Sequence, residues 1–331
     1  MTDTTCLYTT GSLSFGTAGF SGAAGSHPGR CREKNEDRYE LDPQAAFMLV
    51  VDGIGGNAAG EVAAGLAADA IRRQMRTADT PAPQRIRDAI ALANQRIFER
   101  STLEPDLKGM ACVLTLAVVS DGSLIVGHVG DSRLYKLTAG GIAKLTHDHS
   151  PIGDREDRGE LTEIEAMRHP RRNEVYRDVG SQPHDAADED FIELLTTTLE
   201  PDAAVLVCSD GLSDLVTSVE MQRLVRKDAN DPASVVAALI DAANAAGGKD
   251  NITVAYVQGP DFPDRIRNGA TLPLPMRIAG EPQALQPERL APRRGIAWRT
   301  YLFVGILLGL GVLVGLLVTL VLANVFFYGR P

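Results

Sequence analysis

One stretch near the C-terminus limits what this chain can fold into more than any other feature. Leu302–Ala323 contains no charged residue and no proline, and it is apolar on every side when wound as a helix. A helix of this length is about 33 Å long, enough to cross the hydrocarbon core of a bilayer. The alternative is a helix buried in a protein core, but an apolar surface on all sides over this length favours lipid. The run therefore predicts one transmembrane helix.

The charges that flank this run predict its orientation. Arg293, Arg294 and Arg299 precede it, whereas Arg330 follows it. Positive residues concentrate on the cytoplasmic side of membrane helices. The N-terminus lacks the basic and apolar regions of a secretory signal. We therefore expect a single-pass protein of the cell inner membrane, with the part before the span in the cytoplasm.

Glycines in the run are spaced in a way that suits contact between two helices. Gly305 and Gly309 form one GxxxG pair, and Gly311 and Gly315 form another. Such pairs let membrane helices approach closely, which is consistent with a homodimer through the anchor. Glycine is also common in membrane helices that make no such contact, so both interpretations stay open.

The rest of the chain divides into a globular part and a linker. Hydrophobic residues make up 44% of the sequence and charged residues 23%, which is typical of a folded domain. Residues 259–298 are rich in proline and arginine, so we expect a linker between a domain at 1–258 and an anchor at 299–328. The net charge of −10 argues against nucleic acid as a partner, because phosphate contacts need clustered Lys and Arg.

Strand and helix signals alternate along the globular part. Short apolar runs predict strands at Phe47–Val51, Cys112–Val119, Leu124–His128, Leu134–Leu137, Val205–Cys208 and Thr253–Val257. Helices are predicted at Glu61–Met75, Gln84–Arg100, Ile164–Met167 after a capping box of Thr162 and Glu165, and Ala233–Ala246 after Asp231-Pro232. Many strands with helices grouped in pairs predict a layered α+β domain.

Carboxylates recur where apolar strands end or where glycine makes a tight turn. The segments are Asn35-Glu36-Asp37, Asp52-Gly53, Gly130-Asp131-Ser132-Arg133, Ser209-Asp210-Gly211 and Lys249-Asp250-Asn251. An Asp directly after a buried strand projects from a rigid edge, and several such edges can converge. Carboxylate and carbonyl oxygens are the ligands that Mg²⁺ and Mn²⁺ prefer. Each segment alone is also an ordinary turn, but together they predict a site for divalent cations.

The order of these segments resembles the motif series of the 2C-type metal-dependent serine/threonine protein phosphatases. The series reads RCREKNED, VVDGIGG, VGDSR, CSDGLSD and KDNIT, within about residues 13–258. The intervening THDHS, ELTEIEAMRHPRRN and VYRDVG are similar to a segment of bacterial members. The resemblance implies a four-layer α/β/β/α sandwich of two antiparallel sheets flanked by helix pairs, followed here by the transmembrane helix.

The resemblance also implies a role for individual residues. In this family a water or hydroxide bridges two ions of Mn²⁺ or Mg²⁺ and attacks phosphorus. The implied ligands are the carboxylates of Asp37, Asp52, Asp210 and Asp250, the backbone carbonyl of Gly53, and Glu36 through a metal-bound water. A third ion in bacterial members is held at positions that match Asp131, Asp210 and Asp214. Arg32 matches the phosphate-binding arginine, and with Asp37 and Asp52 it would carry the catalysis.

Two parts of the sequence leave the mechanism and the specificity open. Ile54 stands where many eukaryotic members carry a histidine that protonates the leaving group, so a metal-bound water, His147 or His149 would have to serve instead. Ser150–Arg172 would form a mobile flap beside the site. Its arginines suit phosphopeptide binding, but a solvated loop is the alternative that we favour.

These inferences predict a function and its partners. The chain would hydrolyse phosphoserine and phosphothreonine on cytoplasmic proteins, and so oppose a cognate bacterial Ser/Thr kinase. A phosphatase dedicated to one regulator is a second hypothesis, although no sensory domain is visible. A catalytically inactive scaffold that binds phosphoproteins at the membrane is a third, against which the complete set of acidic residues argues.

Overall fold

The strands form two antiparallel sheets. The computed structural model describes residues 7–15, 19–55, 59–77 and 80–268, all within one compact unit, Met1–Arg277. The first sheet runs in the order β1 (Leu7–Phe15), β2 (Phe20–His27), β11 (Ile252–Gln258), β10 (Ala204–Cys208), β7 (Arg133–Thr138) and β8 (Gly141–Lys144). The second runs in the order β3 (Arg38–Asp42), β4 (Phe47–Ile54), β5 (Ala111–Ser120), β6 (Ser123–Val129) and β9 (Glu193–Thr198).

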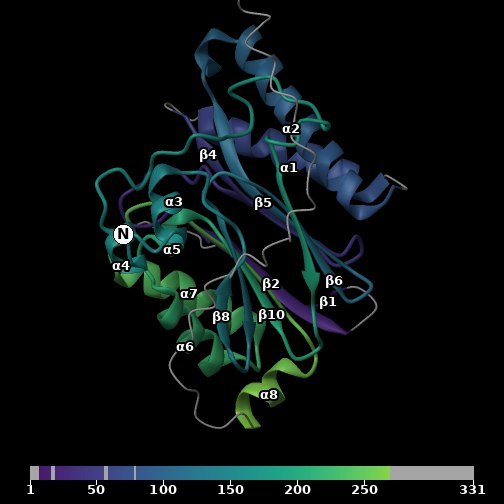
Figure 1. Cartoon of the computed structure of the whole chain (residues 1–331), viewed down its shortest axis with the longest axis vertical. Helices are drawn as coiled ribbons and strands as arrows, with labels where there is room; N and C mark the ends of the chain where they lie inside the picture. The colour runs from purple at the N-terminus through teal and green to yellow at the C-terminus, as the bar shows by residue number, and fades with distance from the viewer. Residues whose placement is uncertain (1–6, 16–18, 56–58, 78–79, 269–331) are drawn as a thin grey trace, which may run out of the picture. The chain divides into compact units, whose positions relative to one another are not determined.

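Two pairs of helices cover the outer faces of the sheets, and Figure 1 shows the pairs apart from each other with strands between them. α1 (Ala59–Thr77) and α2 (Ala82–Leu103) pack on the second sheet, and α6 (Ser218–Asp228) and α7 (Pro232–Ala245) pack on the first. The shorter helices are α3 (Pro151–Asp157), α4 (Glu163–Met167), α5 (Asp210–Ser213), α8 (Phe262–Asn268) and the 3-10 helix η1 (Pro105–Leu107).

The layering follows from the alternation of side chains along buried strands. Phe47, Leu49 and Val51 of β4 face α1 and α2, whereas Met48 and Val50 face the other sheet. Successive side chains of a strand point to opposite faces, so a strand that is apolar throughout needs cover on both sides. The predicted α+β class and the implied α/β/β/α sandwich are confirmed.

Every predicted strand and helix is present, but several elements were not predicted. β1, β2, β3, β8 and β9 were missed, as were α3, α5, α6 and α8. β2 has the sequence FSGAAGSH, and its small side chains carry little strand signal. A Cβ atom at Gly22 would lie 2.8 Å from the Tyr256 carbonyl oxygen, so the small residue is needed because a neighbouring strand lies close. Such a requirement comes from the tertiary structure.

The predicted linker at 259–298 does not begin where we expected, because its first residues form helix α8. Phe262 is fully buried in the same core as α6 and α7, and Ile266 packs against that core one turn later. The globular domain therefore extends past Gln258. Among the described residues, no helix is both long and apolar enough to cross a bilayer. The predicted anchor and its dimer contact lie outside these residues.

A buried ion pair joins the start of β7 to the segment after β8, which includes α3. Arg133 Nε lies 3.0 Å from both carboxylate oxygens of Asp148, and Arg133 Nη2 lies 2.8 Å from Glu156 Oε2. Arg133 and Asp148 are both buried. Lys144 Nζ lies 3.6 Å from Asp148 Oδ1, so a second cation supports the same carboxylate.

Removing this arginine should destabilise the fold. Arg133→Met leaves Asp148 and Glu156 with Lys144 as their remaining close cation, and breaking a buried pair on one side costs about 3–5 kcal/mol. We expect the lower end of that range in urea unfolding. Arg171→Met is the control, because its pair with Glu174 is exposed and should leave unfolding unchanged. Equal midpoints for the two variants would contradict this prediction.

Candidate metal centre and active site

The register of the strands brings the predicted acidic residues to one end of the sandwich. Arg38 of β3 pairs with Val51 of β4, so Asp37, just before β3, comes opposite Asp52 near the end of β4. In the other sheet Asp210 follows β10, and Asp250 lies before the adjacent antiparallel strand β11. The start of one antiparallel strand lies beside the end of its neighbour, which explains why segments far apart in sequence meet here.

Asp37 is the most enclosed of these residues. Its Oδ2 accepts hydrogen bonds from Ser209 Oγ at 2.9 Å and from Thr253 Oγ1 at 2.6 Å. Its Oδ1 is buried and has no hydrogen-bond partner among the described residues. Burial is the largest cause that raises the pKa of Asp37, to about 6. A buried carboxylate oxygen without a partner is costly, and a cation would satisfy it.

The neighbouring carboxylates repel one another. Burial raises the pKa of Asp52 well above its usual value, and the charges of Asp37, Asp210, Asp131 and Asp250 raise it further. The pKa of Asp210 is raised well above its usual value by burial and then by the same kind of acidic neighbours. Carboxylates packed this closely do not all ionise unless a positive group joins them. A divalent cation with oxygen ligands fits this set.

Two glycines bring Glu36 and the Gly53 backbone together. A Cβ atom at Gly60, in the first turn of α1, would lie 2.8 Å from Glu36 Oε2 and 2.8 Å from the Gly53 carbonyl oxygen. Any larger residue at position 60 would separate these groups. Burial raises the pKa of the half-buried Glu36. Both predicted oxygen donors therefore lie at the edge of the acidic cluster.

The residues predicted to hold a third ion line one pocket. Asp131, Asp210 and Asp214 meet there with Arg133 and Arg172. Burial raises the pKa of Asp131 to about 7, and the charges of Asp148 and Asp214 add to the shift. Asp214 Oδ2 accepts a hydrogen bond from Arg172 Nε at 2.5 Å. The structure thus brings the three predicted acids together and places an arginine against one of them.

Arg32 lies at the rim of the acidic cluster. Its Nη2 donates to Asp250 Oδ2 at 2.8 Å, and its side chain is 54% exposed. Its guanidinium also lies within the electrostatic reach of Glu36 and Asp210. The bond to Asp250 uses one terminal nitrogen, so the exposed guanidinium can still donate hydrogen bonds to a phosphate group.

Asn251 organises the loop that carries Arg32 and Asp37, a role that was not predicted from the sequence. Asn251 Oδ1 accepts from the Glu36 amide at 2.8 Å, and Asn251 Nδ2 donates to the carbonyl oxygens of Pro28 at 3.1 Å and Lys34 at 2.9 Å. These bonds hold the loop that carries Arg32 and Asp37. The asparagine in KDNIT was visible in the sequence, but its long-range partners were not. Ser209 and Thr253, which bond Asp37, were missed for the same reason.

The segment predicted to be a mobile flap contains α3 and α4. Glu163 accepts from the Ser218 amide at 2.7 Å and from its hydroxyl at 2.9 Å, which ties the segment to α6. Arg171 pairs with Glu174, and Arg172 pairs with Asp214. Neither hypothesis for the flap, phosphopeptide binding or a solvated loop, predicted that Arg172 would pair with Asp214 and line the pocket of Asp131, Asp210 and Asp214.

Comparison with known proteins agrees with this geometry. A sequence model of the family described as protein phosphatase 2C matches residues 32–252. The chain belongs to the protein phosphatase 2C family. The serine/threonine phosphatase stp of Listeria welshimeri is 32% identical over 240 residues, which cover 70% of this chain and 92% of the relative.

Solved structures of family members share the fold. The Mycobacterium tuberculosis serine/threonine phosphatase PstP/Ppp is 29% identical, with a TM-score of 0.65 over 72% of this chain and 98% of that one. A structure of the PstP catalytic domain in complex with two manganese ions is 28% identical, with a TM-score of 0.64 over 72% of this chain and 97% of that one. The acidic cluster described above is thus found in a phosphatase 2C fold.

The raised pKa values predict how stabilisation by metal depends on pH. Burial raises the pKa of Asp37 to about 6 and the pKa of Asp131 to about 7. An unfolded aspartate has a pKa of about 3.9, so the folded metal-free chain holds protons that the unfolded chain releases. The stability that these protons contribute is present below about pH 4 and is lost as pH rises through about 6 to 7.

Divalent cations replace those protons, because only the deprotonated carboxylate is a good ligand. We expect Mn²⁺ to raise the melting temperature little at about pH 5 and strongly at about pH 8. Differential scanning fluorimetry with and without Mn²⁺ measures the gain, and Asp210→Asn should reduce it at the higher pH. A gain independent of pH would contradict the prediction.

Proposed function

We propose that this chain is a metal-dependent protein phosphatase that hydrolyses phosphoserine and phosphothreonine. The observation that carries the proposal is the meeting of Asp37, Asp52, Asp210 and Asp250 in one cluster, with Arg32 at its rim. Family members named serine/threonine phosphatases support the same reaction. Phosphorylated proteins are the substrates, and a cognate bacterial Ser/Thr kinase is the partner that we propose.

The residues of the cluster fit two ions of Mn²⁺ or Mg²⁺. Asp37, Asp52, Asp210 and Asp250 would supply carboxylate oxygens, Gly53 its carbonyl oxygen, and Glu36 a hydrogen bond to metal-bound water. When bound, such cations lower the pKa of water and neutralise charge on phosphate oxygens. We propose a third ion at Asp131, Asp210 and Asp214, and the PstP domain with two manganese ions supports manganese as the metal.

The side chains of the protein position the phosphate and keep the ligands ionised. Arg32 would bind phosphate oxygens through its exposed guanidinium, as its position at the rim allows. Ser209 and Thr253 donate to Asp37 Oδ2 and so favour its charged form. Ile54 is exposed beside the site, and its hydrocarbon side chain has no acidic proton to donate to the leaving group. His149 is no candidate acid either, because it is buried and Gly130, Glu193 and Arg177 surround its ring nitrogens.

Loss of one carboxylate of the cluster should strongly reduce turnover. We expect Asp210→Asn to lower Mn²⁺-dependent hydrolysis of a phosphothreonine peptide at least ~100-fold, since metal ions supply several kcal/mol of transition-state stabilisation. The assay should use the whole chain in detergent or the unit Met1–Arg277, because a cut at Gln258 removes the buried Phe262. Asp121→Asn, at an exposed turn, is the matched control.

Two outcomes would reject this function. Full activity of Asp210→Asn would show that the cluster is not the active site. A wild-type chain without turnover that binds the phosphopeptide would favour the inactive scaffold. Release of inorganic phosphate and peptide binding by fluorescence anisotropy distinguish the two cases.

We also propose that Leu302–Ala323 anchors the phosphatase in the cell inner membrane with its catalytic domain in the cytoplasm. The apolar length of this run and the arginines before it support that topology. A reporter that is active only outside the cytoplasm should be active when fused after Pro331 and inactive when fused after Asn268. An inactive reporter at both positions, with the protein expressed, would reject the span. Crosslinking in membranes, with Gly309→Leu as the variant, tests the proposed homodimer.

A further inference from the structure

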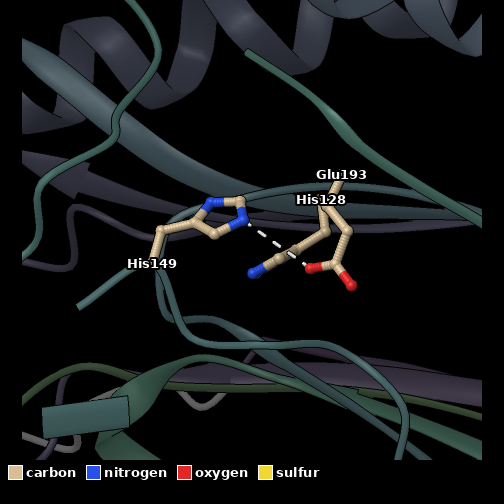
Figure 2. A group of neighbouring side chains, drawn as sticks. All are labelled: His128, His149 and Glu193. Atoms are coloured by element: carbon tan, nitrogen blue, oxygen red, sulfur yellow. Dashed lines mark ion pairs between the residues drawn. The ribbon is translucent and has the colours of Figure 1, made fainter. Parts of the chain in front are cut away.

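A cluster of His128, His149 and Glu193 lies beside the turn that carries Asp131, and Figure 2 shows the His149 ring facing the Glu193 carboxylate. One possible ligand atom from each lies within 4.8 Å of the others, a spacing that would suit a metal ion. The hydrogen bonds show instead that these ring nitrogens already have partners within the protein. His128 Nε2 lies 2.9 Å from the Gly130 carbonyl oxygen and 3.1 Å from the His147 carbonyl oxygen, so it carries a proton that it donates.

The two ring nitrogens of His149 also have partners. The Gly130 amide donates to Nδ1 at 3.0 Å, so the proton of the neutral ring is on Nε2. The protonated Nε2 faces the Glu193 carboxylate, whose Oε2 lies 3.6 Å away, and Arg177 Nη1, which is also a donor and so makes no hydrogen bond with a protonated Nε2, lies 3.1 Å from the same nitrogen. A guanidinium already occupies the position beside Nε2. The cluster is therefore a hydrogen-bonded support and not a second metal site.

The residue that this cluster holds is Gly130. His149 accepts from the Gly130 amide through its ring and donates its own amide to the Gly130 carbonyl oxygen at 2.7 Å. His128 donates to that carbonyl oxygen as well. Gly130 has a φ of +109°, and a Cβ atom there would lie 2.1 Å from Val113 Cγ1. Position 130 can hold only glycine. Its amide and its carbonyl group are thus both fixed immediately before Asp131.

Strand β9 secures the other end of this support. Glu193 Oε1 lies 2.7 Å from His147 Nδ1, and Glu193 Oε2 accepts from the His147 amide at 3.2 Å. The segment from His147 to His149 is therefore tied both to β9 and to the turn after β6. Asp131, the next residue in that turn, is directed into the pocket that Asp210 and Asp214 line.

We propose that His149 is a positioning residue for the third-ion pocket: by holding Gly130 it directs the Asp131 carboxylate toward Asp210 and Asp214. The inference rests on the proposed function, because the pocket is one of the metal sites of the phosphatase. His149 is not among the residues that line this pocket. It acts through the backbone of one residue.

Two amide variants test which ring atom matters. Asn Oδ1 is as many bonds from Cβ as His Nδ1, so His149→Asn keeps an acceptor for the Gly130 amide. Gln Oε1 corresponds to Nε2 instead, so His149→Gln loses that acceptor. Groups that orient metal ligands are typically worth 10–100-fold in metal affinity. We expect His149→Gln to weaken the loosest class of bound Mn²⁺ about tenfold, while His149→Asn stays close to wild type.

Binding is measured on the full chain by the electron paramagnetic resonance of free Mn²⁺, so the readout does not depend on activity. The same variants should shift the Mn²⁺ concentration for half-maximal turnover in parallel. In an Asp131→Asn background, His149→Gln should add no further loss, because its effect passes through Asp131. If His149→Gln does not fold, Glu193→Gln should weaken the same class about threefold, as expected for one weakened hydrogen bond.

Several results would overturn the proposal. Equal losses in the Asn and Gln variants would mean that the acceptor at Nδ1 is irrelevant. An undiminished effect in the Asp131→Asn background would mean that His149 acts elsewhere. A wild-type chain without a third class of Mn²⁺, or a folded Glu193→Gln variant with unchanged binding, would also reject it. A wild-type chain without Mn²⁺-dependent turnover would instead reject the phosphatase function itself.

Discussion

The mutual repulsion of buried carboxylates is the constraint on which the rest of this structure depends. Asp37, Asp52 and Asp210 lie at or just beyond the ends of different strands, and burial raises the pKa of each. Without cations, protons must neutralise part of this charge, and Asp37 Oδ1 stays without a hydrogen bond from the described residues. The cluster lowers the stability of the metal-free fold, which is the expected cost of a site made ready for divalent ions.

The two sheets hold this cluster because their antiparallel registers bring strand starts and strand ends to one edge. Close backbone contacts then fix the loops: Gly60 admits Glu36, and Gly130 packs on Val113. Asn251, just before the neighbouring strand β11, bonds the loop of Arg32 and Asp37. Rigid strands thus position the ligands, while neutral hydrogen-bonding residues secure the loops between them without adding charge.

The third-ion pocket is supported separately. Arg133 binds Asp148 and Glu156 behind it, His149 holds the backbone before Asp131, and Arg172 from the flap pairs with Asp214. Arg172 neutralises one of the acids that would bind the ion. Asp214 is therefore a residue that the flap contacts and that also lines the pocket with Asp131 and Asp210.

The sequence by itself determined the apolar strands β4, β5, β6, β7, β10 and β11, the α+β class and the acidic residues that meet, because apolar runs and strand-end carboxylates are local signals. The charge-free run at Leu302–Ala323 is equally local, and its membrane role stays a prediction. The tertiary structure alone decided that α8 belongs to the domain through Phe262, that β2 can be a strand of small residues, and that Asn251 and His149 hold the loops. These features depend on partners far away in the chain, for which no local pattern exists. Because Ile54 cannot protonate the leaving group, another group must do so. His149 is buried and its Nδ1 accepts from the Gly130 amide, so it positions Asp131 and does not supply that proton.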